Sequence, residues 1–181
     1  MILSDVLSMT PFFVLAYIVK NPYLAGVLFL IALAGIIHHI YVQDRSLLIL
    51  DKLTILLGFL VIGLCTDISD LEKQILFVLI LFAMSALVYI WANNIQVSKR
   101  VGLLISSTAW LPFIIFIIPK LSTISKVFVY LSLVFYMWNT CVCNKNERMS
   151  HVTWGCLHVI ASIAVYFGLR DTGLLKPEFV L

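Results

Sequence analysis

Residues 74–98 read QILFVLILFAMSALVYIWANNIQVS, a run without a single charged side chain. A helix needs about 20 mostly apolar residues to cross the hydrocarbon core of a bilayer, so this run alone predicts a transmembrane span. The rest of the chain repeats the pattern. Six further apolar runs of similar character lie at 3–19, which contains Asp5 and Pro11, at 21–43, at 47–66, which contains Asp51 and Lys52, and at 101–119, 127–144 and 149–169.

Composition agrees with this pattern. Hydrophobic residues make up 62% of the chain and charged residues 12%, whereas soluble domains contain roughly 45–50% and about 25%. Because a soluble core of this size could not cover so much apolar surface, we expect an integral, multi-pass membrane protein. The predicted fold is an all-α bundle of seven transmembrane helices forming one domain, residues 1–181. Which membrane holds it stays open.

The breaks between the apolar runs are short and polar. Pro22 follows Lys20-Asn21, and the residue before a proline disfavours helical geometry, so the first helix should end there. Ser69 or Asp70 is the expected N-cap of the fourth helix. Loops this short place consecutive helices antiparallel. The net charge is only +3 and no basic face or motif is present, which argues against nucleic acid as a partner.

Histidine and aspartate residues are the candidates for chemistry. With seven spans, the end of the second helix, the start of the third and the start of the seventh face the same side of the membrane. His39, Asp51 and His151 are therefore expected at similar depth, with His38 and His158 nearby. Ionisable groups in membrane helices usually face the bundle interior, so this set predicts a metal site.

Geometry and simpler interpretations limit this hypothesis. His151 and His158 share a helix face but are about 10.5 Å apart along the axis of a regular helix, too far for both to bind one ion. A single histidine can instead bond a carbonyl or a lipid headgroup. Asp51 with Lys52 can be an ordinary interfacial pair at a helix start.

Three short motifs resemble a known superfamily. Ile37-His38-His39 ends the second helix, the stretch 48–53 reads LILDKL, and the stretch 150–154 reads SHVTW. This order resembles the CREST superfamily, which joins alkaline ceramidases, progestin-and-adipoQ receptors and myomaker-like proteins. The compact chain with short loops is most similar to the myomaker-like branch.

The resemblance implies a zinc ion held by three histidines, with a serine and an aspartate nearby. His39 matches the ligand of the second helix, His151 the first ligand of the seventh, and Asp51 the acid. Gly155 and Gly35 stand where the family has its second histidine and its serine. If His158 is aligned with the second histidine instead, Trp154 falls on the first. Either His38 or His158 substitutes, or the site is degenerate.

Three functional hypotheses follow from these residues. The first is a zinc-dependent intramembrane hydrolase that acts on a lipid amide or ester, with Asp51 orienting water or acting as base. The second is a non-enzymatic, myomaker-like bundle that remodels membranes or acts as a receptor. The third is an accessory subunit of a larger membrane complex. Membrane lipids are expected partners in all three, and other membrane proteins are further candidates.

Overall fold

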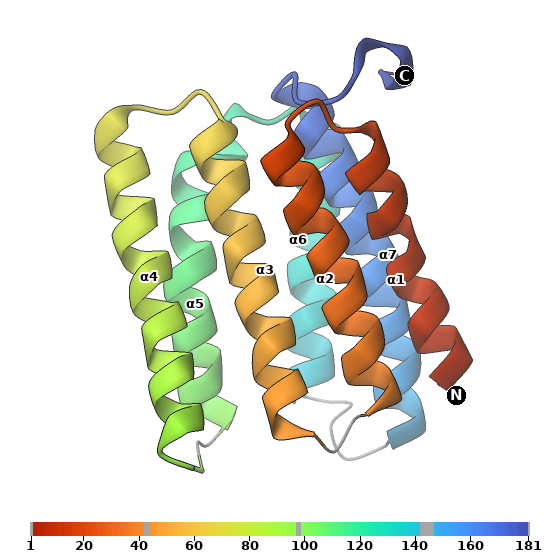
Figure 1. Ribbon diagram of the computed structural model, residues 1–181. Coiled ribbons are helices and arrows are strands. Elements are labelled where there is room, and N and C mark those ends of the chain that lie inside the picture. The colour runs from red at the N-terminus through yellow and green to blue at the C-terminus, as the bar shows by residue number, and fades with distance from the viewer. Residues whose placement is uncertain (1, 42–43, 97–98, 142–146, 181) are drawn as a thin grey trace. The chain divides into compact units, whose positions relative to one another are not determined.

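The computed structural model describes residues 2–41, 44–96, 99–141 and 147–180, and within these ranges the chain is helical without a β-strand (Figure 1). The predicted all-helical class is confirmed, and each predicted run coincides with one helix. The seven α-helices are α1 (Ile2–Ile18), α2 (Pro22–Ile40), α3 (Arg45–Cys65), α4 (Asp70–Ala92), α5 (Lys99–Phe116), α6 (Thr123–Cys141) and α7 (Glu147–Asp171). Two 3-10 turns, η1 (Ile118–Lys120) and η3 (Pro177–Phe179), complete the described elements.

Polar residues between the apolar runs cap the N-termini of three of the helices. Asn21 Oδ1 accepts hydrogen bonds from the first free N–H groups of α2, at 2.9 Å from Tyr23 N. Asp44 caps α3 in the same way. Ser69, and not Asp70, is the N-cap of α4, where it forms a reciprocal capping box with Glu72. These side chains satisfy amide groups that the helices cannot pair internally.

Four helices in the described part of the chain are long and apolar enough to cross a membrane. They comprise α2, α3, α4 and the Val152–Asp171 portion of α7. Shorter apolar helical stretches cover Val6–Ile18 and Trp110–Lys120. How many of the seven helices actually cross a bilayer stays a prediction.

The chain divides into two compact units, which we describe separately. The first unit contains residues 1–40 and 121–181, that is α1, α2, α6 and α7. Here α1 packs against both α2 and α7, and α6 packs against α7. Its core is built from aliphatic side chains that are almost completely buried, among them Leu24, Leu28 and Leu169.

The C-terminal segment that follows α7 pairs with the chain at the end of α1. Val19 and Leu175 form an isolated antiparallel bridge, with Lys20 N bonded to Leu174 O at 2.9 Å and Lys176 N to Ile18 O at 2.9 Å. Leu175 is fully buried. The segment after α7 therefore ties the end of α7 to the junction of α1 and α2.

The second unit, residues 41–120, contains α3, α4, α5 and η1. Gly63 in α3 lets this helix approach α4 closely, because a Cβ built on it would lie 2.8 Å from Leu76 Cδ1. Leu76 and Ile80 of α4 are fully buried, while Val78 and Phe82 are about 60% exposed. The exposed face of α4 is thus as apolar as its core face, as expected for a helix that faces lipid.

Candidate functional site

The central feature of the first unit is a contact between α1 and α7. Ser8 Oγ lies 2.9 Å from Nδ1 of His158, and the hydroxyl is in a side chain that is only 7% exposed. The two residues are 150 positions apart in sequence. Sequence analysis identified His158 but not Ser8. The helix α1 also carries Ser4, Asp5 and Thr10, so no signal in the sequence distinguishes Ser8 from its polar neighbours.

Two aromatic rings surround the same imidazole. The ring of His39, from α2, meets His158 edge-on with centroids 5.3 Å apart, and Trp154 stacks on it at 5.9 Å. His38 lies next to His39 with centroids 5.5 Å apart. We call His38, His39 and His158 the histidine cluster. The structure thus brings together three of the four histidines that the sequence singled out, at the junction of α1, α2 and α7.

The turn of α1 that carries Ser8 is irregular in its hydrogen bonding. Pro11 lies inside the helix and has no N–H, so it cannot donate to the carbonyl of Leu7 four residues earlier. Thr10 Oγ1 donates to that carbonyl instead, at 2.7 Å. Side-chain hydroxyls commonly satisfy carbonyls that prolines leave unpaired in membrane helices. Ser8 therefore stands in a turn whose backbone bonding is completed by a side chain.

The spacing of the histidines bears on the predicted zinc. Two imidazoles that share a tetrahedral zinc place their ring centroids about 5 Å apart, close to the separation of His39 and His158. A catalytic zinc needs three protein ligands, however. Among the residues whose side chains the structure describes, no group of three histidine, cysteine or acidic side chains is arranged to hold a metal ion. The described residues therefore fit a zinc only in part.

The structure does not relate the remaining sequence candidates, His151 and Asp51, to the cluster. His151 lies in α7, but its side chain is outside the described residues. Asp51 belongs to α3 in the second unit, where it is 7% exposed and pairs with Lys52 at 3.6 Å. That pairing matches the simpler interpretation of an ordinary acid–base pair. A role of Asp51 together with the histidines stays a prediction.

The two glycines that depart from the family pattern differ in their surroundings. Gly35 is buried, and a Cβ built on it would clash with Met9 Cε, so a serine at this position would require Met9 to move. Met9 follows Ser8, whose hydroxyl is the one that reaches the cluster. Gly155 has open space, with no heavy atom within 4 Å of a built Cβ. A histidine at position 155 would therefore meet no steric obstacle at its Cβ.

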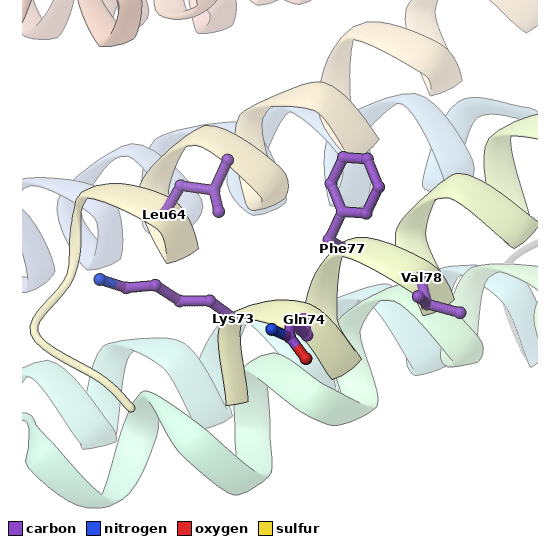
Figure 2. Close-up of a pocket in the computed structure, with 5 residues that line it drawn as sticks. All are labelled: Leu64, Lys73, Gln74, Phe77 and Val78. Atoms are coloured by element: carbon purple, nitrogen blue, oxygen red, sulfur yellow. The ribbon is translucent and has the colours of Figure 1, made fainter. Parts of the chain in front are cut away.

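The structure describes two apolar hollows, one in each unit. One, in the second unit, lies between Leu64 of α3 and four residues of α4, Lys73, Gln74, Phe77 and Val78 (Figure 2). The other, in the first unit, is lined by six residues of α1 and α2: Phe13, Ala16, Tyr17, Ala25, Gly26 and Phe29. Neither is lined by a histidine.

No protein-family model, curated protein or solved structure matches this chain.

Proposed function

We propose that this chain is a multi-pass integral membrane protein that hydrolyses an ester or amide of a membrane lipid at the histidine cluster. The observation that carries this proposal is the convergence of His39, His158 and Ser8 from three separate helices. Imidazole and hydroxyl groups within hydrogen-bond reach are the usual components of a site for acyl transfer. These three side chains lie in a largely apolar unit, and burying polar groups inside a membrane costs free energy, so such groups are usually functional.

The apolar surface supports the membrane part of the proposal. Val14 of α1, Phe82 of α4 and Val134 of α6 are each about 60% exposed. A soluble monomer rarely exposes large contiguous apolar patches. Lipid as the surrounding solvent accounts for these side chains, and it also makes a lipid the most accessible substrate for a site between the helices.

Zinc is the cofactor that the CREST resemblance proposes. When bound, zinc would polarise the substrate carbonyl and lower the pKa of a bound water. His39 and His158 would hold the ion, with His38 or His151 as the third ligand, and the resemblance proposes Asp51 as the acid. Ser8 would then orient His158, because ligating histidines usually engage a partner through their second ring nitrogen.

A non-enzymatic, myomaker-like bundle is the second candidate. Neither described hollow is lined by a histidine, which favours this candidate, since a substrate site is usually concave. The glycine at position 35 also favours it, because the hydroxyl of the family serine is then missing. In this case the cluster would be structural, and the apolar surface would contact membrane lipids or a partner protein, including a larger complex of which the chain is a subunit.

Release of fatty acid from defined lipids tests the proposal. The full chain, in nanodiscs containing phosphatidylcholine and ceramide, is expected to release fatty acid measurable by mass spectrometry. His39→Ala should slow the release by about 100-fold or more, while Tyr130→Ala, which removes an exposed aromatic ring from α6, should not. Release no faster than from empty nanodiscs would contradict the proposal. Zinc retained by the wild type and lost from His39→Ala would support the zinc-dependent form.

A further inference from the structure

We infer that Ser8 is a nucleophile and His158 its general base, an inference that rests on the proposed hydrolase function and assigns its reacting atoms. The distance of 2.9 Å between Ser8 Oγ and His158 Nδ1 lies within the range of about 2.6–3.2 Å expected for such a pair. Nothing in the sequence pattern suggested Ser8, because the contact exists only through the packing of α1 on α7.

The base in such a pair must be held in position by a third group. His158 is bounded on two sides, by the stacked indole of Trp154 and by the edge-on ring of His39. For Nδ1 to accept the proton of Ser8, the imidazole must carry its own proton on Nε2. His39 is the neighbouring imidazole whose ring contacts that of His158. Trp154 and His39 would therefore act as positioning residues for the base.

The surroundings of Ser8 also suit a nucleophile that meets a lipid substrate. Its side chain is 7% exposed, so water has little access to the hydroxyl. The adjacent Leu7 is 55% exposed, so the same turn of α1 also reaches the surface. Exclusion of water strengthens the electrostatic interactions between the hydroxyl and its base. A lipid carbonyl would approach the pair at this turn, where Pro11 interrupts the backbone bonding.

The proposed reaction has two balanced steps. In the first, a bond forms between Ser8 Oγ and the carbonyl carbon while the hydroxyl proton passes to His158 Nδ1. The bond from that carbon to the alcohol or amine then breaks, and His158 returns the proton to this leaving group. In the second step, water attacks the acyl-serine, His158 takes a proton from the water and gives it to Ser8 Oγ, and the fatty acid departs.

This assignment uses His158 as a base, whereas the zinc-dependent form uses it as a ligand. The two uses give different results with a serine-directed reagent. An alkyl fluorophosphonate reacts with an activated serine and leaves a phosphonyl group on it, with loss of fluoride. A metal-dependent hydrolase with an unactivated serine does not react in this way.

The test treats the full wild-type chain in nanodiscs with an alkyl fluorophosphonate and locates the adduct by peptide mass spectrometry. The expected result is phosphonylation of Ser8, slowed about 100-fold or more in His158→Gln. Ser162→Ala is the matched control, because Ser162 is also buried but donates to Val159 O within α7. The Ser162→Ala variant should leave the phosphonylation of Ser8 unchanged. The wild-type chain is itself the target, so the outcome does not depend on a variant that fails to fold.

Two results separate the failure of this inference from the failure of the proposed function. An unmodified Ser8 in wild-type chain that still hydrolyses lipid would overturn the nucleophile assignment and leave the hydrolase function standing. A phosphonylated Ser8 that requires His158, in a chain that releases no fatty acid from the lipids, would support the pair and overturn the lipid substrate.

Discussion

Ser8 Oγ and His158 Nδ1 lie 2.9 Å apart, and this contact joins the first helix of the chain to the last. His39 of α2 meets the same imidazole, so three helices of the first unit contribute to one small polar region. The helices around it bury mainly aliphatic side chains. Function is therefore expected to be sensitive to the few polar residues at this junction and tolerant of changes on the exposed apolar surface.

A histidine introduced at position 155 should strengthen zinc binding. Gly155→His would place an imidazole four residues after His151 and three before His158, positions that share one face of α7. We expect zinc affinity to rise about tenfold or more, equivalent to about 1.4 kcal/mol, measured by competition with a chelator. Gly168→His is the matched control, because a Cβ there also meets no atom within 4 Å. Equal gains in both variants would contradict a metal site at the cluster.

An alanine at position 63 should destabilise the second unit. The added Cβ would lie 2.8 Å from Leu76 Cδ1 and 2.9 Å from Leu76 Cδ2. Leu76 is fully buried, so its side chain would have to repack against its neighbours. Overpacking of this kind costs about 1–3 kcal/mol, which thermal unfolding in detergent would detect. Gly26→Ala is the control, since its Cβ would meet open space, and a loss of similar size in that variant would count against close packing at Gly63.

Asp171 should be a major contributor to the stability of the first unit. Its carboxylate accepts hydrogen bonds from Ser122 N, at 2.8 Å, and from the hydroxyl of the fully buried Ser125, so the last residue of α7 caps the start of α6. Asp171→Ala leaves both donors without this acceptor and should cost about 1–3 kcal/mol. Asp67 is an exposed acid in a loop, so Asp67→Ala should lower the unfolding temperature far less than Asp171→Ala does. Equal effects would argue against the cap.

The C-terminal segment should be protected against hydrogen exchange. Lys20 N and Lys176 N donate to backbone carbonyls across the junction of this segment with α1, at 2.9 Å each. Leu175→Ala removes a fully buried side chain from the bridge, a change that typically costs about 2–5 kcal/mol. Both amides should then exchange faster, while amides in the middle of α4 should not. Fast exchange of these two amides in the wild type would contradict the bridge.

The helices could be predicted from sequence because the apolar runs and their polar breaks are local signals. Asp44 and Ser69 illustrate this, since each caps a helix within three residues of its own position. The bounds of the span 74–98 were less accurate. Its helix begins at Asp70, because the capping box at Ser69 and Glu72 allows charged residues in the first turn.

The candidate site could be predicted only in part. His39 and His158 were recognised because ionisable residues are rare in apolar helices. Their mutual contact, and the contact of His158 with Ser8, depend on how α1, α2 and α7 pack, which residue spacing does not encode. The family pattern predicts a serine at position 35, where the chain has Gly35 packed against Met9. Ser8, the serine that contacts His158, lies one residue before Met9 in α1.

The most direct test of a catalytic site at this junction is a double-mutant comparison of Ser8 and His158. Fatty-acid release would be measured for the wild type, Ser8→Ala, His158→Gln and the double variant in identical nanodiscs. If the two residues act as one unit, each single variant loses most of the activity and the double variant loses little more. Additive losses, or a wild type that releases no fatty acid, would contradict a lipid hydrolase that works through Ser8 and His158.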